Sequence, residues 1–98
     1  MKKDVHNQET ERLMEGILKL SSVEECFAFF EDLCTVNELL SLGQRFEVAH
    51  MLNNRSTYNE VAETTGASTA TISRVNRCLN YGKDGYRLVL DRMEKEKN

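Results

Sequence analysis

The sequence predicts an all-α fold, and two observations lead to that prediction. Apolar residues recur at spacings of three and four along the chain, and alternation of β-branched residues is absent. The 98 residues include no proline and only five glycines, so nothing marks a long linker or a second domain. We therefore expect a single domain over residues 1–98, with a helical core at 8–54, a helix pair at 58–80 and a C-terminal helix at 84–98.

Hydroxyl residues mark the starts of three helices. Ser22, Thr35 and Thr57 are each followed three residues later by a glutamate. In such a capping box the hydroxyl accepts the third helical amide, while the glutamate reaches back to the cap amide. Together with the periodicity, these boxes predict helices at residues 8–20, 23–33, 36–42, 44–53, 58–64, 69–80 and 86–94.

Glycines fall between these predicted helices. Gly43, Gly66 and the pair Gly82 and Gly85 lie beside predicted helix ends. A residue in the left-handed conformation commonly ends a helix, and glycine adopts that conformation at little cost. We therefore expect the glycines to separate successive helices.

The second predicted helix is apolar around most of its circumference. In the segment CFAFFEDLC, residues 26–34, seven of nine residues are apolar, and three of them are phenylalanines. The preceding helix adds a broad apolar face made of Leu13, Met14, Ile17, Leu18 and Leu20. A surface helix of a monomer shows an apolar stripe along one face only. A chain this short also buries only about 60–70% of the surface that its unfolded form exposes. We interpret residues 8–54 as a dimerisation core, with a compact monomer core as the alternative.

Charge is distributed unevenly, although the formal net charge is only −3. Residues 1–54 carry five Lys/Arg against ten Asp/Glu, whereas residues 55–83 carry four against two. Residues 66–83 contain no acid at all. An acidic body with one basic, acid-free segment is typical of a small DNA-binding face, although chance variation over so short a segment would look the same.

The cysteines give no sign of a disulfide framework or a metal site. Cys26, Cys34 and Cys78 are an odd number and include no CxxC pair, which predicts a reducing, cytoplasmic environment. Cys26, Cys34 and His50 match no zinc-ligand spacing, so we expect no metal and no cofactor. No signal peptide is recognisable, and no apolar run approaches the roughly 20 residues that span a bilayer, so we expect no membrane partner.

The segment that starts at Tyr58 matches the twenty-residue pattern of a helix-turn-helix. That pattern has apolar residues at its fourth, eighth, tenth, fifteenth and eighteenth places, a small residue at the fifth and glycine at the ninth. The apolar places hold Val61, Thr65, Ala67, Ile72 and Val75, of which only threonine is an imperfect match. Ala62, at the fifth place, lets the crossing helix approach, and Gly66 opens the tight turn. An ordinary helical hairpin is the alternative.

The second helix of this pattern carries unusually many hydroxyl residues. The segment GASTATISR, residues 66–74, contains four serines and threonines, which compete with the backbone for hydrogen bonds and are poor helix formers. They suit a helix whose N-terminal end meets base edges in the major groove, and Ser68 or Thr69 also caps it. We predict DNA contacts from Asn59, Ser68, Thr69, Ala70, Thr71, Ser73 and Arg77. Solvated hydroxyl groups are the alternative for each residue taken singly.

Two segments, LCTVNELLSLGQRFEVAHML and TYNEVAETTGASTATISR, together resemble the Trp repressor family and, within it, the YerC/YecD group of Trp-repressor-like proteins. The resemblance covers roughly residues 30–80. It implies an intertwined, multi-helix homodimer in which each subunit presents one helix-turn-helix motif to a palindromic operator in double-stranded DNA.

The resemblance also implies a small-molecule corepressor, held between two arginines. Arg45 and Arg74 match those arginines, and Thr35 matches a residue near the ligand's carboxylate. Tryptophan-binding members have glycine where this chain has Val75, and serine where it has Cys78. Valine takes up room that the indole needs and cysteine is a weak hydrogen-bonding partner, so tryptophan is disfavoured as the ligand.

Other roles stay open for the two arginines. The alternatives are that they bind a different small metabolite, that they bind phosphate, or that they form ion pairs with Glu38 or Glu47.

Three classes of function follow from these observations. The leading one is a cytoplasmic, sequence-specific DNA-binding transcription regulator, a repressor that acts as a homodimer with or without a corepressor. The alternative is a helical protein-interaction module, which would show no salt-dependent affinity for DNA. An enzyme is not expected, because His6 lies near a terminus, His50 lies on an apolar helix, and no nucleophile–base pair or glycine-rich phosphate loop occurs.

Overall fold

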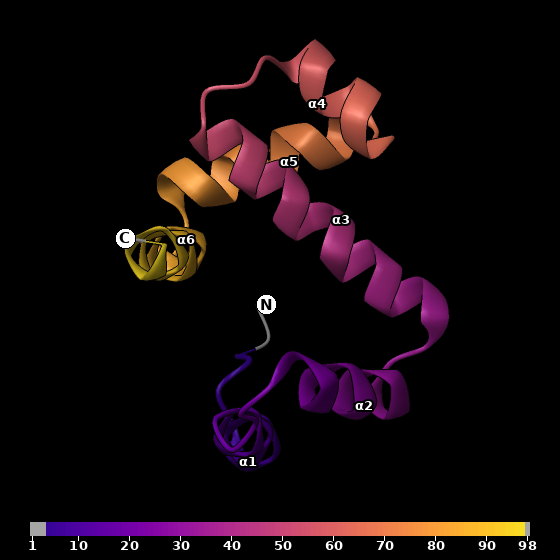
Figure 1. The fold of residues 1–98 in the computed structure, drawn as a ribbon, viewed down its shortest axis with the longest axis vertical. Coiled ribbons are helices and arrows are strands. Elements are labelled where there is room, and N and C mark those ends of the chain that lie inside the picture. The colour runs from indigo at the N-terminus through magenta and orange to yellow at the C-terminus, as the bar shows by residue number, and fades with distance from the viewer. Residues whose placement is uncertain (1–3, 98) are drawn as a thin grey trace. The chain divides into compact units, whose positions relative to one another are not determined.

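A computed structural model describes residues 4–97, and these form six helices and no strand (Figure 1). The helices are α1 (Gln8–Ile17), α2 (Val23–Leu33), α3 (Val36–Asn53), α4 (Tyr58–Thr65), α5 (Thr69–Tyr81) and α6 (Gly85–Glu96). The predicted all-α class is confirmed. The chain divides after Val36 into two compact units, which are described separately below.

The N-terminal unit contains α1 and α2, each begun by a side-chain cap. Asn7 accepts the amide of Thr10, and the Thr10 hydroxyl accepts the amide of Asn7, which forms a reciprocal box that the sequence analysis did not single out. Helix α1 ends at Ile17 instead of the predicted residue 20. The amides of Lys19 and Leu20 bond to carbonyls only three residues back, which tightens the chain into a turn after the helix.

The predicted capping box at the start of α2 forms only in part. Ser22 accepts the amide of Glu25, as expected. The carboxylate of Glu25, however, accepts the amide and the hydroxyl of Ser21 rather than the amide of the cap residue. These bonds lower the pKa of Glu25, and the one from the Ser21 amide has the larger effect.

Helix α3 is continuous, so the prediction of two helices at 36–42 and 44–53 was wrong. Gly43 lies inside the helix and does not end it. The only positive-φ glycine among the described residues is Gly66. Glycine permits a helix end but does not impose one, and its cost of about 1 kcal/mol relative to alanine is small beside the bonds of a helix this long.

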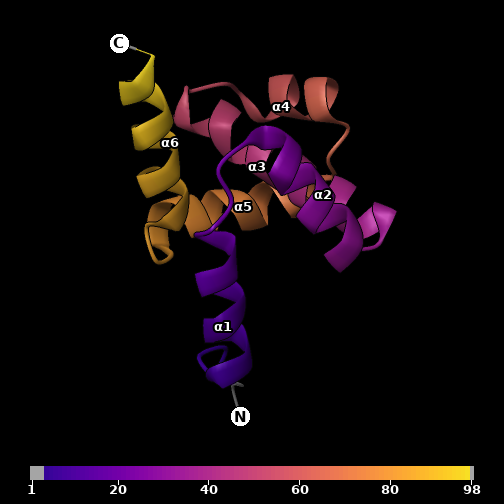
Figure 2. The same cartoon turned by 60° about the horizontal axis from the view of Figure 1, so that its bottom comes forward.

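The core of the C-terminal unit is assembled from four helices and one connection. The buried cluster joins Val48 and Ala49 of α3, Val61 of α4, Ala67 before α5, Ile72 and Val75 of α5, and Leu90 of α6. Helix α5 packs against both α4 and α6, between which it lies in both views (Figures 1 and 2). The cluster therefore fixes α5 to each of the other helices of this unit.

A single arginine adds polar bonds at the end of α5. From α6, Arg87 donates through Nε to the carbonyl of Leu79 at 3.0 Å and through Nη2 to the Asn80 side chain at 3.0 Å. Its Nη1 donates to the Asn53 side chain, at the end of α3, at 3.3 Å. Arg87 thus joins the ends of α3 and α5, and no sequence pattern had pointed to it.

Left-handed residues lie at three connections, and at two of these the left-handed residue is not a glycine. Gly66 ends α4 with φ 73°, as predicted. Before α6 the left-handed residue is Asp84, with φ 64°, whereas Gly85 is the first residue of the helix and Gly82 has φ −85°. Arg55 is the third, with φ 67°. The glycine pair therefore does not supply the left-handed residue that the sequence analysis expected there.

Replacing Gly66 by alanine should destabilise the protein by roughly 1 kcal/mol, because a Cβ is strained at positive φ even where space is open. Gly66→Asn is the matched control, since asparagine carries a Cβ but tolerates the left-handed region. Urea unfolding should rank the free energy of unfolding as wild type, then the asparagine variant, then the alanine variant. Equal stability of the two variants would contradict the conformational explanation.

Candidate nucleic-acid interface

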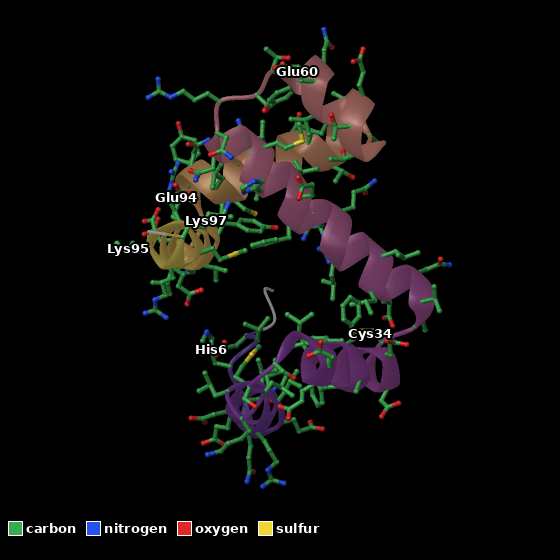
Figure 3. All side chains as sticks on the ribbon, viewed as in Figure 1. His6, Cys34, Glu60, Glu94, Lys95 and Lys97 are labelled. Atoms are coloured by element: carbon green, nitrogen blue, oxygen red, sulfur yellow. The ribbon has the colours of Figure 1, made fainter. Side chains whose placement is uncertain are left out.

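Helix α4 begins with the complete capping box that the sequence predicted. The Thr57 hydroxyl accepts the amide of Glu60 at 3.1 Å, and the Glu60 carboxylate accepts the amide of Thr57 at 2.7 Å. Glu60 is labelled at this helix in Figure 3. The bond from the Thr57 amide, followed by a smaller side-chain bond, lowers the pKa of Glu60 below its ordinary value of 4.5. The box thus fixes where α4 starts, and Asn59 lies exposed in the first turn of this helix.

The connection between α4 and α5 is held by Thr65, the residue that matched its pattern least well. The Thr65 hydroxyl donates to the Val61 carbonyl at 2.7 Å and accepts the amide of Ala67 at 3.1 Å. From α3, the Gln44 side chain donates to the Thr65 carbonyl at 3.1 Å. A polar residue therefore suits this place because its hydroxyl satisfies backbone groups of the turn. No pattern of neighbouring residues had pointed to this role of Gln44.

Helix α5 is capped by Ser68, one of the two residues proposed for this role. Ser68 has an extended backbone with φ −70° and ψ 159°, and its hydroxyl accepts the amide of Thr71. No acidic residue occupies the first turn of α5. The positive end of the helix dipole is therefore not offset by a carboxylate of its own first turn, which favours an approaching anion.

The two faces of α5 differ sharply in chemistry. Ile72, Val75 and Leu79 recur at helical spacing and are buried. The predicted contact residues on this helix and its cap are exposed, apart from the half-buried Thr71; the exposed ones are Ser68, Thr69, Ala70, Ser73 and Arg77. Burial of one stripe thus turns small hydroxyl residues and an arginine toward the surface. This is a surface that could meet a polar, anionic partner.

The three residues matched to a ligand site come from different places in the fold. Arg45 lies half-buried on α3 and Arg74 exposed on α5, both in the C-terminal unit. Thr35 belongs to the N-terminal unit, so no single unit places all three. The Nε of Arg45 is buried and finds no hydrogen-bond partner among the described residues. A buried N–H donor without a hydrogen-bond partner costs free energy. Binding of a ligand whose acceptor atom reached this Nε would therefore be favoured.

The two departures from the tryptophan-binding pattern differ in their surroundings. Val75 is 2% exposed and belongs to the buried cluster. Cys78 is exposed and has a free thiol. Val75 therefore fills part of the buried core against which α5 packs.

Within the described residues 4–97, no helix is long and apolar enough to cross a membrane.

Comparison with known proteins identifies the family of this chain. The model of the family described as "Trp repressor protein" matches residues 8–94. The chain belongs to the Trp repressor family. It is 54% identical over 90 residues to the uncharacterized protein YerC of Bacillus subtilis, a match that covers 92% of this chain and 86% of that protein.

Two solved structures from this family resemble the chain throughout most of its length. One, of a TrpR-like protein from Eubacterium eligens, has a TM-score of 0.87 at 59% identity and covers 90% of this chain and 91% of that one. The other, of a Trp repressor candidate from Staphylococcus aureus, has a TM-score of 0.88 at 49% identity and covers 92% and 90%. Membership of the Trp repressor family indicates a DNA-binding transcription regulator.

Changing Glu60 to glutamine should reduce stability above about pH 4.5 and have progressively less effect below it. The folded-state pKa of Glu60 is lowered, so its ionised form stabilises the protein above the unfolded pKa, and that stabilisation is lost as the pH falls through the folded pKa. Urea unfolding between pH 3 and pH 7 tests this. Glu63→Gln, the same change of charge later in α4, is the control, and an equal pH dependence for both variants would contradict a role for the capping box.

Proposed function

We propose that this protein is a sequence-specific DNA-binding transcription regulator, a cytoplasmic repressor that binds a palindromic operator as a homodimer. The observation that carries the proposal is the exposed face of α5, which is free of acidic residues and rich in hydroxyl groups and arginine. In the helix-turn-helix arrangement α4 crosses the DNA backbone, and α5 enters the major groove with its N-terminal end toward the bases.

The contacts divide into base readout and phosphate binding. Thr69, Ala70, Thr71 and Ser73 lie in the first turns of α5, where short side chains reach base edges, and Asn59 adds a contact from α4. Ser68 lies at the helix cap, beside the amides that favour phosphate. Arg77 lies on the same exposed face one turn beyond Ser73 and binds phosphate, which positions the helix without selecting a sequence.

Homodimerisation is supported by how little of the N-terminal half is buried. Helices α1 and α2 contain no buried residue, although most of α2 is apolar. Leu18 is 82% exposed and Phe27 is 58% exposed. The first half of α3 adds Val36 and Leu40, which are also exposed. A second copy of the chain would remove these surfaces from water, and each large side chain so buried contributes roughly 1.5–3 kcal/mol.

Phe27→Asp should weaken the dimer by a hundredfold or more, because an aspartate buried without a partner costs several kcal/mol and about 1.4 kcal/mol corresponds to a factor of ten. Phe27 is largely exposed in the single chain, so the helical fold should be less affected than the association. Sedimentation equilibrium at micromolar concentration measures this, with Glu31→Gln on the same helix as the control. A wild-type protein that sediments as a folded monomer would refute the dimer.

Ser73→Ala and Arg77→Ala should affect DNA binding in different ways. Loss of the Ser73 hydroxyl should change the preference at one or two positions in each half-site by about 1–3 kcal/mol. Loss of Arg77 should weaken binding to all sequences alike and reduce the salt slope by about one unit. Fluorescence anisotropy over a range of salt concentrations, on DNA selected from a random pool, separates the two effects.

The reverse pattern would refute the assignment of these two residues. If the wild-type protein shows no salt-dependent affinity for any DNA, the chain acts instead as a protein-interaction module.

We further propose that a small metabolite other than tryptophan modulates DNA binding through Arg45 and Arg74, both of the C-terminal unit. The unpartnered Nε of Arg45 supports this site, since an acceptor on the ligand would satisfy it. The burial of Val75 argues against an indole ring there, because the side chain already fills space in the core.

L-tryptophan should therefore bind with a dissociation constant no lower than the millimolar range and should leave operator affinity unchanged. Titration calorimetry, followed by operator binding with added L-tryptophan, measures both. In the double variant Val75→Gly with Cys78→Ser, tryptophan affinity should rise. The fold should lose roughly 2–4 kcal/mol, since a buried side chain is removed and glycine is placed within a helix. Micromolar binding of tryptophan by the wild-type protein would overturn the prediction.

A further inference from the structure

Arg87 bonds to two other helices at once. Its side chain is half-buried on α6. Nε donates to the Leu79 carbonyl and Nη2 donates to the Asn80 side chain, both at 3.0 Å and both near the end of α5. Nη1 donates to the side chain of Asn53, the last residue of α3, at 3.3 Å. One guanidinium group therefore joins three helices of the C-terminal unit.

The direction of each bond follows from the chemistry of the groups. A guanidinium has five N–H donors and no acceptor, so Arg87 donates in all three bonds. The amide of Asn80 is oriented from both sides, because its oxygen accepts from Arg87 while its Nδ2 donates to the Asn76 carbonyl at 2.9 Å. Lysine would not replace this arrangement, since its ammonium is a compact point charge and lacks the planar fork.

The apolar core holds a different part of α5. The buried cluster contains Ile72 and Val75 of this helix, together with residues of α3, α4 and α6. Leu79, one turn later, is buried but does not belong to that cluster. Apolar burial is non-directional, whereas a hydrogen bond confines the distance and angle between two groups. The cluster therefore fixes the first half of α5, and the Arg87 bonds fix its end.

A helix that is held at two points along its length has a defined axis. At 1.5 Å per residue, Leu79 lies about 8 Å beyond the midpoint of Ile72 and Val75, and Thr69 lies about 7 Å before it. If the end of α5 were released, the helix could pivot about the cluster, and Thr69 would move by a similar distance in the opposite direction. Thr69 belongs to the first turn, which we propose meets base edges. Bonds at one end of α5 thus control the place of the other.

Helix α3 links these bonds to the proposed dimer interface. It is continuous from Val36 to Asn53. Leu40, near its start, is 66% exposed and belongs to the apolar surface that a second copy of the chain would cover. Asn53, at its end, accepts from Arg87. In a homodimer, the separation of the two copies of α5 therefore depends on how firmly each α5 is fixed to its own α3.

We propose that Arg87 is a positioning residue that sets the spacing of the two half-sites that the homodimer binds. Dimers with a helix-turn-helix motif bind half-sites about 34–36 Å apart, one turn of DNA, because the separation of their recognition helices is fixed. Arg87 acts through Asn53 and the end of α5, without touching DNA itself. This inference rests on the proposed DNA-binding homodimer and extends it to the geometry of its operator.

The test compares two variants that break the Arg87 bonds with one that changes only the charge of α6. Arg87→Lys keeps the positive charge but loses the planar fork. Asn53→Ala removes the bond to α3 and leaves the two bonds to α5. Arg92→Gln, at an exposed position of the same helix, is the control. Thermal unfolding defines a temperature at which every variant is folded, and DNA binding is measured there.

The measurement is affinity as a function of half-site spacing. DNA that the wild-type protein prefers is selected from a random pool, and its two half-sites are then placed one base pair closer together or farther apart. Each base pair shifts a half-site by about 3.4 Å and turns it by about 34°, so a rigid dimer loses contacts with one of them. Fluorescence anisotropy at constant salt gives the affinity for each spacing. Single-base changes within a half-site are measured alongside.

The wild-type protein and Arg92→Gln should bind the preferred spacing about tenfold more tightly than either neighbour, a penalty similar to that of one mismatched base pair. For Arg87→Lys and Asn53→Ala this preference should fall to about threefold or less, and the double variant should lose no more than either single variant. Base preference within a half-site should stay unchanged, because the exposed face of α5 keeps all its side chains.

An unchanged spacing preference in Arg87→Lys and Asn53→Ala would overturn the inference, whether or not affinity falls equally on every DNA. An equal fall is the result expected if Arg87 only stabilises the fold. The homodimeric regulator would stand in either case. An equal loss of spacing preference in Arg92→Gln would also overturn the inference, since charge alone would then explain the effect.

The behaviour of the wild-type protein separates this inference from the function on which it rests. If the wild-type protein shows no salt-dependent affinity for DNA, or binds DNA without a preferred half-site spacing, the proposed homodimeric regulator fails and the inference fails with it.

Discussion

Burial of one stripe of α5 is the constraint on which the C-terminal unit depends. Ile72, Val75 and Leu79 lie on one side of this helix, and the first two meet buried residues of α3, α4 and α6. Because the core is small, loss of one side chain would leave a cavity that the rest cannot fill. The orientation of α5 about its own axis is therefore set by apolar packing, and the chemistry of its opposite face follows from that orientation.

This arrangement explains how a helix of poor helix formers can be stable. Serine and threonine each cost several tenths of a kcal/mol relative to alanine within a helix. The packing of Ile72 and Val75 and the cap bond from Ser68 offset that cost. Arg87 and Thr65 add hydrogen bonds at the end of α5 and in the turn before it. The exposed positions are thus free to carry residues chosen for contact with a partner.

The two units of the chain differ in how much apolar surface they bury. Residues 37–98 enclose a buried cluster, whereas the helices of residues 1–36 enclose none. A short chain has too little interior to hide every apolar helix, and in the proposed homodimer the second copy covers the apolar surface of the N-terminal helices. The two-fold symmetry of such a dimer would match that of the proposed palindromic operator.

Local sequence patterns were enough to predict the helical class, most helix starts and the buried face of α5. These are local properties: a hydroxyl followed three residues later by a glutamate satisfies the amides of its own first turn, and the spacing of Ile72, Val75 and Leu79 is set by helical geometry.

The remaining features depend on contacts between residues that are distant along the chain. Gly43 stays helical although it resembled a helix end, and Asp84 takes the left-handed place expected of a glycine. Gln44 and Arg87 hold the turn and the end of α5 from 21 and 8 residues away along the chain. Such bonds depend on which helices the core brings together, and a pattern of neighbouring residues carries no information about that.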